Sequence, residues 1–325
     1  MHRRLLLAGL SSPLLAQLGA PLVARAQAFP DRPIRIISPY PPGGGTDVTA
    51  RLMAPHLTEF LGQPIVVENR GGAAGALGAA VVAEAPADGH TLLMDSLGHV
   101  VNPHILKGLR FNYATAFAPV SLMVVLPQFL SVPASLPVNT TAQFVAWCKA
   151  RPGRLSYGSS GNGSGAHLAA LLFLRETGLD LTHVPYRGGS AVIPDLIAGN
   201  VSFAFTTVTV SANLIHDGRL KALAVTHASR LATMPEVPTT AELGMPAVDV
   251  DEWNALFSVA GTPVAAMARL HAAAMHALAR PNVRERFAAM GAIMVGNSMA
   301  AATSFVAERR EAMGRLVRDA QVSIE

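Results

Sequence analysis

Two glycine-rich segments hold the residues whose types and spacing could support chemistry. The first, "IRIISPYPPGGGTDVTARL", covers residues 34–52 and passes from a β-branched apolar run through prolines and three glycines to a threonine and an aspartate. The second, "LSYGSSGNGSGAHLAALLFL", begins at residue 155. Each segment reads as a strand, a loop and the start of a helix. Loops of this kind can cradle a phosphate, present a nucleophile or bind a carboxylate.

The helix that follows each loop offers groups that bind anions. Its first N–H groups have no partner within the helix, and the helix dipole adds partial positive charge there. In the first loop, Gly44 and Gly45 allow a ligand to approach the backbone, while Thr46 or Asp47 could cap the helix or point a polar group at the ligand. The second loop offers similar groups, namely Ser159, Ser160, Asn162, Gly163 and Ser164.

Neither glycine-rich loop matches a complete phosphate-binding or nucleotide-binding motif. No Gly-Lys-Ser/Thr sequence follows either loop, so neither is a P-loop. The second loop fits the relaxed dinucleotide pattern at Gly161, Gly163 and Ala166, but that pattern expects an acidic residue at the end of the next strand. Here the next strand ends in Tyr186 and Arg187. The sequence therefore argues against a nucleotide cofactor.

A hydrolase remains the alternative from another functional class. Ser160 has Gly158 at the first glycine position of a nucleophile elbow, but Asn162 stands at the final one. His167 and His183 could serve as bases, although a single histidine near a loop is more often a structural residue. An exported serine hydrolase would use Ser160 with His167.

The N-terminal residues have the layout of a secretory signal peptide. Arg3 and Arg4 form a basic start, residues 5–18 are mostly apolar, and small residues precede candidate cleavage sites at Ala26 and Ala28. The apolar run is shorter than the roughly 20 residues of a spanning helix. We expect residues 1–28 to be a signal peptide, cleaved near Ala26 to Ala28, and the protein to be periplasmic in a Gram-negative host.

Composition argues against nucleic acid and metal. Without residues 1–28 the chain loses three arginines and no acidic residue, so 25 basic against 21 acidic side chains becomes 22 against 21. A nucleic-acid partner would favour a clustered basic surface. The single Cys148 excludes an internal disulfide, and His271 and His276, five residues apart, would face different sides of a helix. We therefore expect no metal and no cofactor.

Strand-like and helix-like segments alternate along the chain, which predicts an α/β protein with parallel sheets. The predicted strands are 34–38, 65–68, 91–94, 120–125, 129–132, 155–157, 181–184, 201–205, 220–225 and 255–259. The predicted helices are 47–60, 74–85, 142–150, 164–177 and 192–198, followed by a long C-terminal set.

The repeated strand, loop and helix unit favours two similar lobes over a single sheet. Residues 120–138 read as a passage between lobes, and residues 251–263 as the return. We therefore expect lobe 1 to comprise residues 29–126 and 255–325, and lobe 2 residues 127–254. With one glycine-rich loop in each lobe, the two loops would face a shared cleft.

Several segments together resemble one family of receptors. They include "FPDRPIRIISPYPPGGGTDVTARLMAPHL", "GQPIVVENRGGAAGALGA", "GRLSYGSSGNGSGAHLA", "THVPYRGG" and "MPEVPTTAELG". The chain resembles the Bug (Bordetella uptake gene) or TctC-like solute-binding proteins of tripartite tricarboxylate transporters over essentially all of its length after residue 28. The resemblance implies a two-lobed, type II-like venus-flytrap fold, capture of a carboxylate between the lobes, delivery to membrane transporter subunits, and no catalysis. We also expect a monomer. A sensing subunit of a signalling system would share the same sequence features.

The resemblance also implies a set of ligand-binding residues. By position these are Tyr40, Gly44, Gly45, Thr46, Asp47, Ser96, Ser160, Gly163, Ser164, Thr206 and Thr207. The chain departs from the family pattern at Thr206, where aspartate is common, and at Thr207, where asparagine is common. Without that carboxylate, we expect the ligand to be a dicarboxylate, tricarboxylate or aromatic carboxylate that has no amino group at that end.

Overall fold

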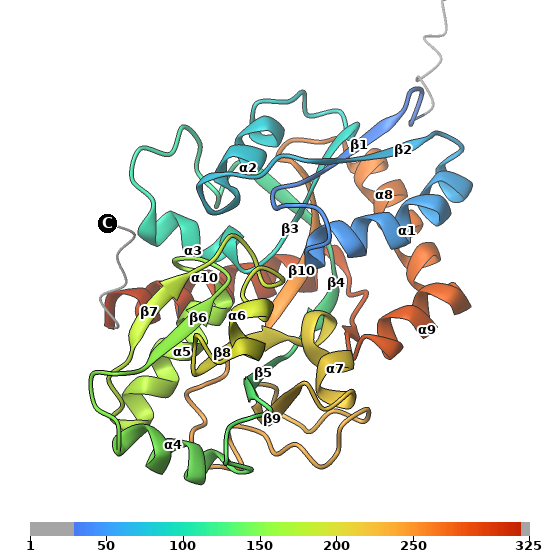
Figure 1. Cartoon of the computed structure of the whole chain (residues 1–325). Helices are drawn as coiled ribbons and strands as arrows, with labels where there is room; N and C mark the ends of the chain where they lie inside the picture. The colour runs from blue at the N-terminus through green and yellow to red at the C-terminus, as the bar shows by residue number, and fades with distance from the viewer. Residues whose placement is uncertain (1–28, 320–325) are drawn as a thin grey trace, which may run out of the picture.

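Two β-sheets form the centres of two lobes, which lie one above the other in Figure 1. The computed structural model describes residues 29–319, so the predicted signal peptide and its cleavage sites lie outside the described residues. Helices cover the sheets of both lobes (Figure 1). The predicted α/β, two-lobed architecture is therefore confirmed.

Lobe 1 is built on a six-stranded sheet in the order β11-β4-β10-β3-β1-β2. Its strands are β1 (Ile34–Ser38), β2 (Ile65–Asn69), β3 (Thr91–Asp95), β4 (Phe117–Leu126), β10 (Glu252–Val259) and β11 (Ile293–Met294). Its helices are α1 (Gly45–Leu61), the short η1 (Ala73–Gly75), α2 (Ala76–Ala83), α3 (Gly98–Ile105), α8 (Val264–Leu278), α9 (Pro281–Ala289) and α10 (Met299–Asp319).

Lobe 2 is built on a five-stranded sheet in the order β7-β6-β8-β5-β9. Its strands are β5 (Gln128–Pro133), β6 (Ser156–Ser159), β7 (Thr182–Pro185), β8 (Phe203–Thr207) and β9 (Leu220–Val225). Its helices are α4 (Thr141–Lys149), α5 (Gly165–Thr177), α6 (Ile193–Ala198) and α7 (Val208–His216).

Both sheets are mixed, so the prediction of parallel sheets was wrong for part of each. β1 pairs in parallel with β2 and β3, and β6 with β7 and β8, as helical crossovers require. However, β10 is antiparallel to β3 and β4, and β5 is antiparallel to β8 and β9. The reason is topological, because the chain leaves lobe 1 along β4 and returns along β10, and these two neighbours therefore run in opposite directions.

The two passages between lobes lie close together and are joined by hydrogen bonds. Only Pro127 separates β4 from β5, and β10 begins at Glu252, three residues before the predicted return at 255. The Gln128 side chain donates to the carbonyl of Val250 at 2.6 Å. A buried polar side chain needs such a partner, so this bond fixes the outgoing strand against the returning one.

The apolar segments of the sequence supply the core of each lobe. Ile34, Ile36 and Ile37 of β1 are completely buried, as expected for a strand covered on both faces. Phe173 and Phe203 play the same part in lobe 2, where their rings meet edge to face at 5.5 Å. The loops at the ends of these strands are therefore held on rigid supports.

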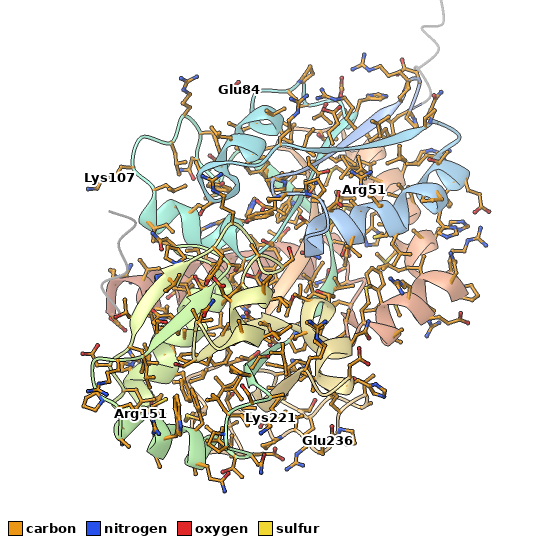
Figure 2. The ribbon with its side chains drawn as sticks, in the orientation of Figure 1. Arg51, Glu84, Lys107, Arg151, Lys221 and Glu236 are labelled. Carbon is orange, nitrogen blue, oxygen red and sulfur yellow. The ribbon has the colours of Figure 1, made fainter. Side chains whose placement is uncertain are left out.

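Charged side chains of both signs are spread over the surfaces of both lobes. Six of them are labelled in Figure 2, namely Arg51, Glu84, Lys107, Arg151, Lys221 and Glu236. Between residues 29 and 319, none of the helices has both the length and the apolar character that crossing a membrane requires. The same residues contain no cluster of three or more histidine, cysteine, aspartate or glutamate side chains able to hold a metal ion.

Candidate ligand-binding cleft

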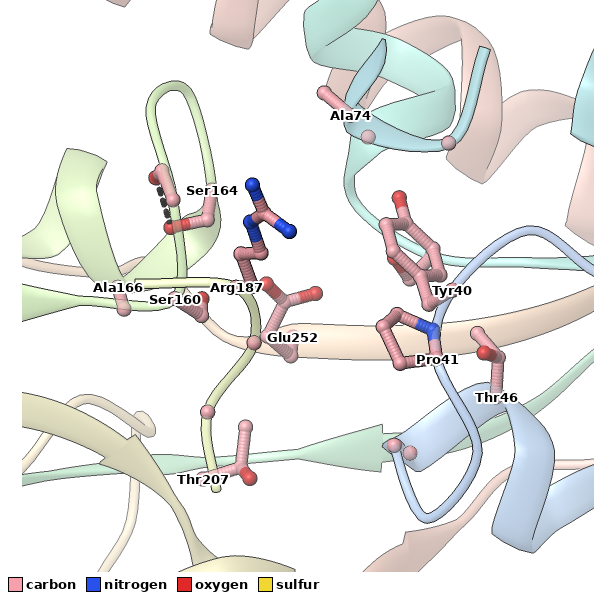
Figure 3. A pocket seen from close by; sticks show the side chains of 18 of the residues that line it. Tyr40, Pro41, Thr46, Ala74, Ser160, Ser164, Ala166, Arg187, Thr207 and Glu252 are labelled. Atoms are coloured by element: carbon pink, nitrogen blue, oxygen red, sulfur yellow. Dashed lines mark hydrogen bonds between the residues drawn. The ribbon is translucent and has the colours of Figure 1, made fainter. Parts of the chain in front are cut away.

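A cavity of about 730 Å³ lies between the two lobes. The loop after β1 and the loop after β2 line it from lobe 1, and the loops after β6 and β7 together with the end of β8 line it from lobe 2. Figure 3 shows Tyr40, Pro41 and Thr46 on one side of it and Ser160 and Ser164 on the other. The volume falls within the range of small-molecule sites, roughly 300–1,000 Å³.

Most of the residues predicted for the site line this cavity. They are Tyr40, Gly44, Gly45, Thr46, Ser96, Ser160, Gly163, Ser164, Thr206 and Thr207. Asp47 is not among the lining residues, because its carboxylate is used inside the first loop. The two glycine-rich loops thus face one cavity.

In the first loop, Asp47 turns back toward the loop that precedes it. Its Oδ2 accepts the Gly43 N–H at 2.9 Å, and its Oδ1 accepts from Arg51 Nε at 2.8 Å. Burial alone would raise the pKa of Asp47, but these hydrogen bonds outweigh it and hold the pKa below its usual value. Asp47 therefore shapes the loop as an ionised carboxylate and does not project into the cavity.

The start of α1 is open to the cavity. Gly44 is the N-cap in an extended conformation and makes no side-chain cap bond, while the hydroxyl of Thr46 is paired with that of Ser38 at 2.8 Å. Among the described residues, the N–H groups of Gly45 and Thr46 have no hydrogen-bond partner. A Cβ on Gly45 would lie 2.9 Å from Leu126 Cδ1, so only glycine fits there without displacing that side chain. These N–H groups can therefore receive an anion.

A residue of the second loop itself, Ser164, caps the N-terminus of α5. Ser164 Oγ accepts the His167 N–H at 3.2 Å and donates to the Gly161 carbonyl at 2.7 Å, the latter bond drawn in Figure 3. Gly163 has a φ of +71°, and a Cβ added there would lie 2.2 Å from Cδ1 of Ile105 on α3. The second loop therefore packs directly against lobe 1.

Glu252, which the sequence reasoning missed, supplies a carboxylate to the cleft. Its Oε1 accepts the Gly165 N–H at the start of α5 at 3.1 Å, and the N–H of Leu97 also donates to this carboxylate. Figure 3 shows the side chain projecting from β10 into the cavity. Burial above all, together with the charges of Asp95 and Asp251, raises the pKa of Glu252 to about 7 against these two hydrogen bonds.

Two stacked histidines hold the second loop through hydrogen bonds. His167 and His183 lie 4.0 Å apart between ring centroids, with their planes only 5° from parallel. His167 Nδ1 accepts the Gly163 N–H at 3.1 Å, and His183 Nε2 is paired with Ser159 Oγ at 2.7 Å. Burial, together with His183, lowers the pKa of His167 to about 4. Between residues 29 and 319 no hydrogen bond joins Ser160 to His167, so the geometry gives the hydrolase alternative no nucleophile and base pair.

Thr206 is more deeply buried than its predicted role as a ligand-binding residue requires. It is 2% exposed, and its hydroxyl donates to Ser211 Oγ at 2.8 Å and is paired with Ser131 Oγ at 2.6 Å. The missing acid at position 206 does not leave the cleft without a carboxylate. Glu252 supplies one from the strand that returns from lobe 2.

Comparison with known proteins identifies the family. The family model described as "Tripartite tricarboxylate transporter family receptor", TctC, matches residues 49–322. The chain belongs to the TctC family. It is 34% identical over 307 residues to protein BugT of Bordetella pertussis, covering 94% of both chains. Rpa4515 of R. palustris, solved with adipate, shares 32% identity with a TM-score of 0.85 over 91% of this chain and 99% of that one. MatC of Rhodopseudomonas palustris, solved with malate, shares 31% identity with a TM-score of 0.82 over 89% and 100%.

Beyond its predicted site residues, this TctC-family receptor places two further groups at the cleft. Arg187, which follows β7, lines the cavity as a cation. In the loop after β2, Ala73 and Ala74 adopt left-handed φ values of 47° and 52°, and the carbonyl of Ala74 accepts from Asn102 Nδ2 at 2.9 Å. The predicted helix 74–85 therefore begins as α2 only at Ala76, and nothing in the sequence signalled alanines in a conformation that favours glycine.

Proposed function

We propose that this receptor holds a small carboxylate between its lobes, with one carboxylate group of the ligand on the N-terminus of α1, and delivers it to a membrane transporter. The observation that carries the proposal is the pair of unpartnered N–H groups of Gly45 and Thr46 beside the cavity. A helix N-terminus with free donors favours a negative charge. Membership of the TctC family supports the same reading.

The available donors suffice for useful affinity. A hydrogen bond to a charged group contributes about 1.5–3 kcal/mol, and micromolar binding corresponds to about 8 kcal/mol. Two backbone N–H groups, the Ser160 hydroxyl and Arg187 line the cavity. Three or four such bonds reach that range before the cost of ordering the ligand is subtracted.

The ligand class follows from the relatives and from the polar groups at both ends of the cleft. Rpa4515 was solved with adipate and MatC with malate, and both ligands are dicarboxylates. In this chain the first loop offers donors at one end of the cavity, and Ser160 and Arg187 offer donors at the other. We therefore propose a dicarboxylate first, with tricarboxylates and aromatic acids as the other members of the class.

A thermal-shift screen of residues 29–325 tests the proposal directly. The panel holds dicarboxylates, tricarboxylates, aromatic acids and nicotinate-like acids, and the dimethyl ester of adipic acid serves as the uncharged control. A ligand at 100 times its Kd stabilises the folded state by about 2.7 kcal/mol. We expect at least one acid to raise the melting temperature while the ester does not. If no acid in the panel does so, the proposed carboxylate function is wrong.

Delivery requires that the lobes close on the ligand and that the closed form be recognised. Small-angle scattering with the best acid of the screen should show a smaller radius of gyration than the protein alone. Receptors of this family are periplasmic, and we propose that residues 1–28 are the export signal, cleaved near Ala26 to Ala28. N-terminal sequencing of the exported protein checks the cleavage site, and its elution volume checks the proposed monomer.

A further inference from the structure

A carboxylate of the protein itself lies where one end of a dicarboxylate would bind. Glu252 Oε1 accepts the Gly165 N–H of α5 in lobe 2, and the same carboxylate accepts the N–H of Leu97, which precedes α3 in lobe 1. The helix end that faces the ligand from lobe 2 is therefore already occupied by an internal anion. The corresponding end of α1 is open, because the N–H groups of Gly45 and Thr46 have no partner among the described residues.

The charges around Glu252 are mostly negative or neutral. Directly before β10, Asp251 is bonded to His227 Nδ1 at 2.7 Å, and at the end of β3 Asp95 is bonded to His99 Nδ1 at 3.0 Å. Both carboxylates act on Glu252 through space. Each has its own histidine partner, so neither depends on Glu252 for compensation.

The remaining groups that face Glu252 come from loops. Tyr40 lies across the cavity, where burial and the nearby Asp95 keep its pKa well above the ordinary value, so that the phenol stays neutral. From lobe 2, Arg187 lines the same cavity but forms no ion pair with Glu252 within residues 29–319. Glu252 is therefore held by two backbone N–H groups alone, without a cation.

A second ligand carboxylate placed near the loop of Ser160 and Ser164 would lie close to Glu252. Two carboxylates that share one site cannot both remain ionised, because each raises the pKa of the other. One proton taken from solvent removes the repulsion and replaces it with a charge-assisted O–H to O⁻ hydrogen bond. A monocarboxylate bound only at the N-terminus of α1 would need no such proton.

We propose that the cleft binds a dicarboxylate together with one proton, which Glu252 shares with the second carboxylate of the ligand. The proposal rests on the proposed function, since it assumes that an acid occupies the cleft. The position of Glu252 in the cavity wall supports it, and a pKa of about 7 leaves the group ready to take up a proton near neutral pH. Affinity would then depend on pH for dicarboxylates but not for monocarboxylates.

Isothermal titration calorimetry with adipate and hexanoate, six-carbon acids that differ in one carboxylate, tests this inference. Titrations at about pH 8 in two buffers of different ionisation enthalpy count the protons taken up on binding, and at that pH adipate is doubly ionised because a free carboxyl titrates near 4.3. We expect nearly one proton per adipate and almost none per hexanoate. Adipate affinity should fall about tenfold per pH unit above about pH 8.

Two variants assign the proton to its site. Glu252→Gln keeps an oxygen that can accept the Gly165 N–H and adds a permanent N–H donor, so its adipate proton count should fall almost to zero and its affinity should no longer vary with pH. Glu84→Gln, on the exposed surface of lobe 1, should keep the count of the unmodified protein. The adipate and hexanoate comparison needs no variant, so a folding defect in Glu252→Gln leaves it intact.

The outcomes separate this inference from the function on which it rests. Equal proton counts for adipate and hexanoate, or an unchanged count in Glu252→Gln, would overturn the inference. Binding of hexanoate without adipate, at both about pH 6 and about pH 8, would also overturn it while leaving a carboxylate receptor. Failure of every acid in the thermal-shift panel would instead overturn the proposed function.

Discussion

The starts of α1 and α5 come from the same sequence pattern but differ in what they can bind. At α1, Gly44 makes no side-chain cap bond and Asp47 turns back to Gly43, which leaves N–H groups for a ligand. At α5, Ser164 caps the helix and Glu252 occupies the Gly165 N–H. One helix end is open to an external anion, and the other already holds an internal one.

The supports beneath the two loops differ as well. Under the first loop, the ion pair of Asp47 with Arg51 and the paired hydroxyls of Ser38 and Thr46 hold the backbone. Under the second, the stacked rings of His167 and His183 do so, and the burial of both rings favours the neutral forms. Acid should therefore weaken the second support within a pH range that leaves the first intact.

The largest expected effect is the loss of stability on acidification that His167 causes. Unfolded histidine binds a proton near 6.5 but folded His167 only near 4, so the unfolded state binds more protons in between and stability falls as the pH drops through that window. A shift of this size corresponds to on the order of 3 kcal/mol. His167→Asn, which keeps an acceptor for Gly163, should lose less stability between pH 7 and pH 5 in urea unfolding.

The contribution of Glu252 to stability has the opposite pH dependence. The acid sensitivity of His167→Asn must therefore be compared with that of the unmodified protein. Because its pKa is raised, Glu252 makes its full contribution to the free energy of unfolding below about pH 4.5. That contribution is lost as the pH rises toward about 7. His216→Asn, at an exposed position on α7, is the matched control and should keep the original pH dependence. An unchanged acid sensitivity in His167→Asn would show that the histidine pair does not carry this effect.

The sequence predicted both loops and the strands that lead into them because these features are local. Apolar β-branched runs, glycine clusters and capping residues act over a few positions, and Ser164 is the cap of α5 as its position suggested. Strand direction is not local. β10 reads as any buried strand, and only its return from lobe 2 beside β4 makes it antiparallel.

Glu252 could not be assigned from sequence for a related reason. Residues 251–263 predict a return between lobes, but the first residue of a strand gives no sign of which way its side chain points. An acidic residue directly before the buried run "WNALFSV" was the one available signal. Thr206 shows the same limit, since its partners Ser131 and Ser211 come from other elements.

A second comparison uses the left-handed glycines of the two loops. Gly43 has a φ of +80° with open space around a Cβ, whereas a Cβ on Gly163 would meet Ile105 of lobe 1. Alanine at either position should cost about 1–2 kcal/mol of backbone strain in the free energy of unfolding. Only Gly163→Ala should also weaken binding of the best acid of the screen, by about tenfold or 1.4 kcal/mol, because it opposes the contact between lobes.

Ile105→Ala distinguishes contact between lobes from distortion of the second loop. Combined with Gly163→Ala, it removes the atoms that the new Cβ would meet, so calorimetry should show most of the lost affinity restored. The backbone strain at Gly163 would remain, and the free energy of unfolding should therefore not recover. Equal losses of affinity in Gly43→Ala and Gly163→Ala would contradict the view that only the second loop packs across the cleft.

The smallest expected effect separates two serines of the second loop. Ser164 caps α5, so Ser164→Ala should lower the free energy of unfolding by about 1 kcal/mol. The Ser160 side chain lines the cavity and makes no hydrogen bond among residues 29–319, so Ser160→Ala should change stability by less than about 0.5 kcal/mol but weaken acid binding. Urea unfolding and calorimetry on both variants check this division. If Ser160→Ala instead abolished turnover of an ester that the unmodified protein hydrolyses, the serine would act as a nucleophile, and the second loop would have to be reinterpreted.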